Sequence, residues 1–126
     1  MLNNPIAWFE IYVEDMARAK AFYQAVLRVT LEQLSDPTDE QLEMWAFPSQ
    51  MDQYGAGGSL VKMEHYPPGG NSTIIYFSCE DCAIEESRVA AAGGSVTRAK
   101  MSIGEYGFIS LITDTEGNTI GLHSMA

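Results

Sequence analysis

The stretch 8-WFEIYVEDMARAKAFYQAV-26 decides the fold, because 74-IIYFSCEDCAIEESRVAAA-92 repeats its pattern 66 residues further along the chain. Each copy has a short apolar run typical of a strand, then Glu-Asp, then the periodicity of an amphipathic helix. Asp15 and Asp81 occupy matching places. Each is expected to cap its helix by accepting from the free N–H groups of the first turn. The sequence therefore predicts a strand–helix unit that occurs twice.

The two predicted helices differ in the strength of their apolar face. The first carries a complete stripe at helical spacing: Met16, Ala19, Phe22, Tyr23, Val26 and Leu27. The second keeps only part of that stripe: Cys82, Val89 and Ala92. Glu85 and Arg88 stand where the first helix has Ala19 and Phe22. We expect the second helix to pack more loosely, or to lie at a wetter edge of the core.

Short runs with strand propensity follow each helix: near 29–34, 42–47, 58–63, 95–100, 107–113 and 118–123. The last two are joined by 114-DTEG-117, a hairpin turn in which Gly117 is expected to take a positive φ. The segment 64-EHYPPGGNS-72 contains Pro-Pro-Gly-Gly and is expected to be a loop between the halves.

The pattern predicts an α+β fold built from two tandem βαβββ modules. Its length of 126 residues suits one domain with its own hydrophobic core. We expect a single domain, residues 1–126, with module one at about 5–64, a linker at about 65–72 and module two at about 73–124. A composition of 46% hydrophobic and 19% charged residues is typical of a globular protein.

Charge and hydropathy exclude several classes of partner. The formal net charge of −10 repels phosphate backbones, so we expect no nucleic-acid partner. No apolar run approaches the ~18 residues of a membrane span, and MLNNPIAWFE lacks the basic start and apolar core of a signal peptide. We therefore expect a cytoplasmic protein without a membrane partner, in which thiols stay reduced.

Both cysteines lie in one C-x-x-C spacing, which could belong to a redox pair, to half of a zinc site, or to the core. The repeat aligns Cys79 with Val13 and Cys82 with Met16, which are apolar positions. A zinc site needs further ligands at matching spacing, and the only histidines are His65 and His123. We therefore interpret the two cysteines as packing residues.

Three stretches together resemble one known family: 8-WFEIYVEDMARAKAFYQAVL-27, 75-IYFSCEDCAIEESRVAAAGGSV-96 and 103-IGEYGFISLITDTEGNTIGLH-123. They are similar to the vicinal oxygen chelate superfamily, which includes glyoxalases, extradiol dioxygenases, and fosfomycin and bleomycin resistance proteins. The small lactoylglutathione lyase-related members are the most similar. The resemblance implies a cupped, incomplete-barrel mixed sheet and a homodimer. One departure is Arg28, where the family usually has glycine.

The resemblance also implies four strand positions for the ligands of a divalent metal. Three of them hold Trp8, Ile74 and Gly121 in this chain. The fourth lies near 58–63, where residues 58–61 offer no His, Glu or Asp and Lys62 cannot serve while protonated. Zn²⁺, Ni²⁺ and Fe²⁺ need imidazole, carboxylate or thiolate donors. We therefore expect no metal cofactor at the usual place, and Gly121 cannot supply the carboxylate base of glyoxalase chemistry.

Strand alternation predicts which side chains point into the cup. Two of them could move protons and are the candidate catalytic residues, Glu10 and His123. The others are candidate ligand-binding residues: Trp8, Tyr12, Ile74, Tyr76, Ser78, Thr119 and Gly121. Each has a plainer alternative, because aromatic residues can fill a core, Glu10 could lie at an exposed edge, and His123 lies near the end of the chain. Two glycine-containing loops, 48–58 and 99–107, are candidate lids.

We expect the protein to bind a small, partly apolar organic molecule in the cup without the usual metal. The alternatives are a lyase or isomerase with Glu10 as base, a metal-dependent lyase, and a dioxygenase-like enzyme. In a metal-dependent enzyme, the metal could bind further along the strands, between Glu10 and His123. A protein-interaction module would need an exposed apolar patch. The sequence leaves open whether the protein is an enzyme.

Overall fold

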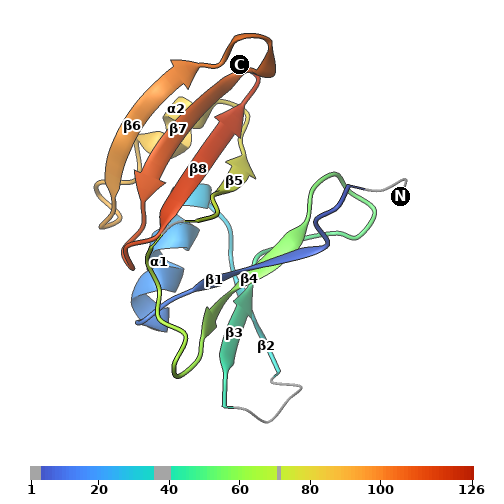
Figure 1. Ribbon diagram of the computed structural model, residues 1–126, viewed down its shortest axis with the longest axis vertical. Coiled ribbons are helices and arrows are strands. Elements are labelled where there is room, and N and C mark those ends of the chain that lie inside the picture. Colours follow the sequence, from blue (N-terminus) through green and yellow to red (C-terminus); the bar gives the residue numbers. More distant parts are fainter. Residues whose placement is uncertain (1–3, 36–40, 71) are drawn as a thin grey trace.

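The computed structural model describes residues 4–35, 41–70 and 72–126. The first half contains, in chain order, β1 (Trp8–Tyr12), α1 (Met16–Leu27), β2 (Glu32–Leu34), β3 (Glu43–Ala46) and β4 (Gly57–Lys62). The second half contains β5 (Ile75–Ser78), α2 (Cys82–Glu86), β6 (Ser95–Ser102), the 3-10 turn η1 (Gly104–Tyr106), β7 (Phe108–Thr113) and β8 (Thr119–Ser124) (Figure 1). The βαβββ order therefore occurs twice, and the predicted α+β fold is confirmed.

The strands form two four-stranded mixed sheets that do not close into a barrel (Figure 1). The first sheet has the order β1-β4-β3-β2 and the second has the order β5-β8-β7-β6. In each sheet the first strand runs parallel to the last strand of its module, and the other neighbours are antiparallel. Within the described residues, β1 and β5 are therefore edge strands with no strand on their outer side.

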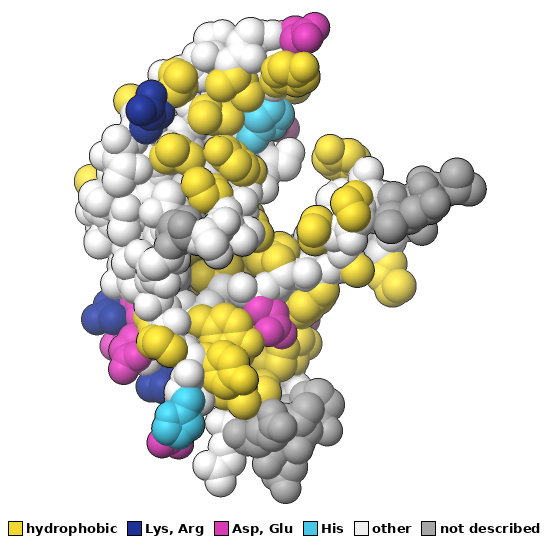
Figure 2. All heavy atoms as spheres, viewed as in Figure 1, with side chains coloured by type: hydrophobic (Ala, Val, Ile, Leu, Met, Phe, Trp, Pro, Cys, Tyr) yellow, Lys and Arg dark blue, Asp and Glu magenta, His cyan; other side chains and the backbone are white. Residues whose placement is uncertain are grey.

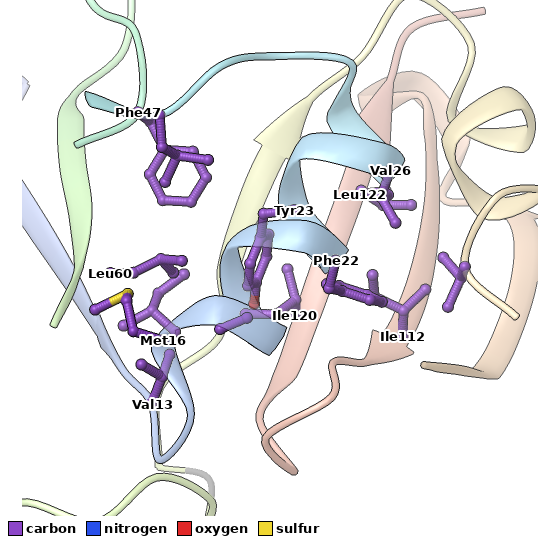
Figure 3. Packing of buried hydrophobic residues seen from close by; sticks show 14 of the residues in the cluster. Val13, Met16, Phe22, Tyr23, Val26, Phe47, Leu60, Ile112, Ile120 and Leu122 are labelled. Atoms are coloured by element: carbon purple, nitrogen blue, oxygen red, sulfur yellow. The ribbon is translucent and has the colours of Figure 1, made fainter. Parts of the chain in front are cut away.

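The helix α1 lies between the two sheets (Figure 3). Asp15 caps it as predicted, because its side chain accepts from the backbone N–H of Arg18 at 3.0 Å. One side of the helix faces Leu60 of the first sheet and the other faces Ile112 of the second (Figure 3). The stripe predicted from the sequence is buried at five positions: Met16, Ala19, Phe22, Tyr23 and Val26. The helix ends at Arg28, whose φ of 56° is a left-handed conformation that favours glycine.

The helix α2 is shorter and contributes less to the core. It comprises five residues, of which only Cys82 is buried. Asp81 caps it by accepting from the backbone N–H of Ala83 at 3.0 Å, and the chain then continues in turns before β6. This looser packing agrees with the weaker stripe. Neither helix in the described part of the chain is long and apolar enough to span a membrane.

The two cysteines take part in packing. Cys82 is fully buried in the core, and half-buried Cys79 packs against the same cluster. Burial, followed by the charge of Glu85 and a hydrogen bond with it, raises the pKa of the Cys79 thiol to about 12. The packing interpretation of the C-x-x-C spacing is therefore confirmed for Cys82, and Cys79 stays a protonated thiol at neutral pH.

A buried carboxylate joins the β7–β8 turn, residues 114–118, to the start of α1. Glu116 accepts from the backbone N–H groups of Glu14 and Asp15, each at 2.9 Å, and its Oε2 lies 2.6 Å from Arg18 Nε. Burial alone would raise the pKa of Glu116, but the hydrogen bonds from Arg18 and the two backbone groups lower it to about 2. The sequence predicted the turn and the positive φ of Gly117, which is 84°, but not this anchor.

Asp114 extends the same polar network. It accepts from the Tyr23 hydroxyl at 2.6 Å and from Asn118 Nδ2 at 3.0 Å. Asn118 Nδ2 also donates to the carbonyl oxygen of Tyr12 at 3.0 Å, which ties the end of β1 to the start of β8. The relative position of the two sheets is therefore set by hydrogen bonds as well as by the apolar core.

Candidate functional site

Each sheet has an open face, which we define as the face that points away from the helices. On the first sheet, Ile11 and Val13 are buried in the core. Strand alternation therefore places Trp8, Glu10 and Tyr12 on the open face. The side chain of Trp8 is 44% exposed, so this aromatic residue does not belong to the core.

Tyr12 and Glu10 form a side-chain pair on this open face. The Tyr12 hydroxyl donates to Glu10 Oε1 at 2.9 Å, and the Tyr12 ring stacks on Tyr66 with ring centroids 5.6 Å apart. Burial, followed by the hydrogen bond to Glu10 and its charge, raises the pKa of Tyr12 to about 12. The hydroxyl is therefore protonated at neutral pH and positions the Glu10 carboxylate.

On the second sheet, Phe77 packs against the core and Tyr76 lies on the open face, where it is 45% exposed. Ile74, which immediately precedes β5, is 37% exposed, and Ser78 is exposed as well. Tyr76 pairs with Gly121 across β5 and β8, and a Cβ atom at position 121 would overlap the Tyr76 ring. Glycine at this position therefore lets the tyrosine ring lie over β8.

His123 lies on the second sheet, near the end of β8. Its Nε2 is 2.7 Å from the carbonyl oxygen of Tyr106, in the turn η1. Because a carbonyl oxygen can only accept, Nε2 is the donor in this contact. The candidate lid 99–107 therefore contacts the candidate site through η1, although its first residues, 99–102, belong to β6.

A hollow of about 560 Å³ contains three of the candidate residues: Ile74, Tyr76 and Ser78. Its other side is formed by residues 4–6, Phe9 and residues 54–56, the last of these from the candidate lid 48–58. Figure 2 shows the surface hollowed between the second sheet and the part of the first sheet in which β1 and β4 begin. A larger cavity of about 630 Å³ beside the linker contains none of the candidate site residues.

A separate, smaller cavity of about 220 Å³ contains Glu10, Tyr12 and Thr119. His123 does not line this cavity, and it lies three residues beyond Ile120, which does. That spacing corresponds to about 10 Å along a strand. The structure therefore does not place Glu10 and His123 in one cavity, either as an acid–base pair or as two ligands of a displaced metal.

The positions that the resemblance assigns to metal ligands offer no donor set. The β1–β4 register pairs Glu10 with Ser59, and the β5–β8 register pairs Tyr76 with Gly121, so Ser59 is the fourth position left unaligned from the sequence. The four positions hold an indole, an alkyl chain, a hydroxyl and a bare hydrogen: Trp8, Ile74, Ser59 and Gly121. Among the described residues, no group of three or more His, Cys, Asp or Glu is placed to hold a metal. These residues do not fit the divalent metal that the resemblance implies.

Comparison with solved structures shows where this fold occurs. Glyoxalase I from Zea mays superposes with a TM-score of 0.74 at 18% identity, over 94% of this chain and 44% of that chain. The present chain therefore spans less than half the length of the maize enzyme. TnmS3, an antibiotic binding protein from a Streptomyces species, superposes with a TM-score of 0.67 at 23% identity, over 100% of this chain and 99% of that chain. A glyoxalase/bleomycin resistance protein from a Streptomyces species superposes with a TM-score of 0.64 at 26% identity, over 94% of this chain and 98% of that chain.

Family assignment rests on the sequence as a whole. No curated protein matches the chain significantly. The family model of the Glyoxalase/Bleomycin resistance protein/Dioxygenase superfamily, in contrast, matches residues 5–122, which include both βαβββ modules. This chain is therefore a member of the Glyoxalase/Bleomycin resistance protein/Dioxygenase superfamily.

Proposed function

We propose that this protein binds a small, partly apolar organic molecule in the hollow beside β5, without the divalent metal of its enzymatic relatives. The observation that carries the proposal is the hollow of about 560 Å³, in which Ile74 and Tyr76 are exposed. Its volume lies in the usual range for small-molecule sites. Exposed large apolar residues that gather on one face mark an interaction site, because burying them in a ligand complex is favourable.

The comparisons support binding as the first candidate. TnmS3, with the same fold over 99% of its length, is an antibiotic binding protein, so this fold can hold an organic molecule. Likeness of fold does not by itself carry a ligand from one chain to another. The missing donor set at the metal positions favours capture of a ligand over metal-dependent turnover.

We also propose that two copies of the chain form a homodimer through β1 and β5. Both are edge strands among the described residues, and exposed strand edges readily pair with another chain. A second copy placed there would also cover part of the hollow. Sedimentation equilibrium is expected to give twice the mass of one chain, and a single-chain mass would contradict this part of the proposal.

The two tryptophans allow the binding proposal to be tested at one site. Trp8 lies on the open face and its ring is close to Gly57, which adjoins the hollow. Trp45 lies on the helix side, with Lys20 Nζ 3.2 Å from the centroid of its ring. The probe is N-phenyl-1-naphthylamine, a neutral aromatic compound that accepts energy from tryptophan. In Trp45→Phe protein, which retains Trp8, we expect saturable quenching with a Kd on the order of 10 µM. Quenching in Trp8→Phe protein should be weaker.

Tyr76→Ala provides the matched variant. Because Tyr76 lines the hollow, its removal is expected to weaken probe binding about fivefold or more. Tyr106→Ala is the control, since the Tyr106 ring is 67% exposed and does not line the hollow. Absence of saturable binding, or equal losses in the two variants, would contradict the proposal.

An enzyme that uses Glu10 as a general base is the second candidate function. It is favoured by the Tyr12–Glu10 hydrogen bond, which positions a carboxylate in the cavity of about 220 Å³. The hemithioacetal of methylglyoxal and glutathione is the substrate to try first. If turnover occurs, Glu10→Gln is expected to lower kcat by about 10²-fold or more while circular dichroism stays unchanged. Activity that survives this substitution would exclude Glu10 as the base.

A further inference from the structure

A smaller pocket of about 210 Å³ continues from the hollow toward the helices. The two cavities share part of their lining: Phe9, Ala56, Phe77 and Ser78. Phe47 and Leu27 are among the further apolar residues that line the inner pocket, and Glu85 of α2 is its charged lining residue. We call this space the Glu85 pocket. Its volume is below that of drug-sized sites and suits a single ring with a short substituent.

The walls of the Glu85 pocket are aromatic and well packed. The ring centroids of Phe9 and Phe77 are 5.8 Å apart in a T-shaped contact, and those of Phe47 and Phe77 are 5.4 Å apart. Phe47 also contacts Tyr23 of α1, which belongs to the hydrophobic core. A ring that enters the pocket would therefore meet aromatic edges and faces that the core already holds in place.

Glu85 introduces a carboxylate into these apolar surroundings. Its Oε1 atom is buried and has no hydrogen-bond partner in the described part of the chain. The neighbouring Cys79 thiol interacts with the same carboxylate but does not satisfy this oxygen. A buried polar atom without a partner is costly, and such atoms in a native structure call for an explanation. In the repeat, Glu85 stands where α1 has Ala19, which is buried, so a carboxylate is not needed to build this type of helix.

The nearby cations are engaged elsewhere. Lys100 Nζ lies 2.8 Å from Asp81, and Arg88 Nη1 donates to the carbonyl oxygen of Val26 at 3.1 Å. The described residues therefore provide no cation bound to Glu85. A cation supplied by a ligand would give Oε1 a charge-assisted hydrogen bond, and the phenylalanine rings would attract the same charge. The net charge of −10 also raises the local concentration of cations.

We propose that the Glu85 pocket selects ligands that carry a protonated amine on an aromatic ring. The ring lies among Phe9, Phe47 and Phe77, and the ammonium group donates to Glu85 Oε1. This inference rests on the proposed function, because the pocket opens from the same hollow, and it names the chemical class of the ligand. It gives α2 a part in ligand binding, whereas the sequence pattern alone presents this segment only as a weakly amphipathic helix.

A matched pair of probes tests the proposal. Benzylamine is protonated at neutral pH, whereas benzyl alcohol has the same ring and nearly the same shape without the charge. For the unmodified protein, titration calorimetry is expected to show benzylamine bound at least about tenfold more tightly than benzyl alcohol. Glu85→Gln should reduce this preference to about twofold or less. Glu80→Gln removes a charge from an exposed neighbouring residue and should leave the preference unchanged.

A steric variant locates the binding. Ala56→Leu adds bulk to the wall that the hollow shares with the Glu85 pocket and is expected to weaken both probes together. The proposal is overturned if the unmodified protein shows no preference for benzylamine, or if Glu85→Gln keeps the preference. Failure of this inference is distinguishable from failure of the proposed function, because N-phenyl-1-naphthylamine carries no ammonium group and its quenching of Trp8 does not depend on Glu85.

Discussion

The two helices occupy equivalent places in the repeat but contribute unequally to the hydrophobic core. The helix α1 has twelve residues, five of them buried, and contacts both sheets, whereas α2 has five residues with only Cys82 buried. At aligned positions, Phe22 is fully buried and its counterpart Arg88 is not. The comparison teaches that one module supplies the core helix, while the other leaves space beside its helix. The Glu85 pocket occupies part of that space.

The starts of the two helices differ in the same way. The start of α1 is held by Glu116, a carboxylate whose side chain is fully buried. The corresponding part of α2 is held by an ion pair between Asp81 and Lys100, whose side chains are 42% and 25% exposed. Solvent screens the second pair, so it contributes less. The two modules therefore share one topology but contribute unequally to the stability of the fold.

Exchanging the aligned residues Phe22 and Arg88 for alanine should show the largest difference. Phe22→Ala removes a fully buried ring and is expected to lower the free energy of unfolding by about 3–5 kcal/mol. Arg88→Ala removes the hydrogen bond to Val26 and is expected to cost at most about 1.5 kcal/mol. Urea unfolding of both variants measures the difference, and equal losses would mean that the two helices contribute alike.

Acid should weaken the anchor of α1 before the rest of the core. The folded-state pKa of Glu116 is lowered from 4.5 to about 2, so its stabilising contribution is complete above the unfolded value and is lost as pH falls. The shift corresponds to about 3 kcal/mol at neutral pH. In Glu116→Gln protein, the free energy of unfolding should be lower by about that amount at neutral pH, and the gap should narrow between about pH 5 and about pH 2.

Glu64→Gln is the control for this pH series, because the Glu64 side chain is 88% exposed. Its stability should follow that of the unmodified protein throughout. A gap between Glu116→Gln and the unmodified protein that stays constant with pH would show that the loss comes from packing and not from the charge of Glu116.

The smallest expected effects concern two residues with a positive φ: Arg28, directly after α1, and Gly93, in the turns that follow α2. Arg28 has a φ of 56°, so Arg28→Gly is expected to stabilise the protein by about 0.5–1 kcal/mol. Gly93, in the turns after α2, has a φ of 102°, and Gly93→Ala is expected to destabilise by about 1 kcal/mol. Thermal unfolding measures both shifts. A lower melting temperature for Arg28→Gly would show that the arginine side chain outweighs its backbone strain.

Much of the fold can be predicted from local sequence signals, such as helix caps, apolar periodicity and turn glycines. The Asp15 and Asp81 caps, the buried stripe of α1 and the positive φ of Gly117 each depend on residues that are close together in the sequence. The open face of the first sheet also follows from alternation along a single strand. For α2 the sequence predicts looser packing but not a short helix, because Glu85 and Arg88 weaken the apolar stripe without marking where the helix ends.

The candidate site was harder to predict, because it depends on how separate strands are placed. Glu10 and His123 both lie on strands that alternation assigned, yet His123 does not line the cavity that contains Glu10 and lies further along β8. Ser59 could be aligned with Gly121 only through the strand registers. Glu116 looked like an ordinary turn residue, and no local signal marks it, because the helix start that it holds lies 101 to 102 residues earlier in the chain.

The repeat, the order of strands and helices, and the lack of metal donors at Trp8, Ile74 and Gly121 can all be read from the residues alone. Each of these depends on residue type and on spacing along the chain. The folded arrangement was needed to show that α1 lies between the sheets, that Glu116 anchors it, and that Glu85 lines an apolar pocket. These features depend on contacts between residues far apart in the chain, and neither periodicity nor propensity encodes such contacts.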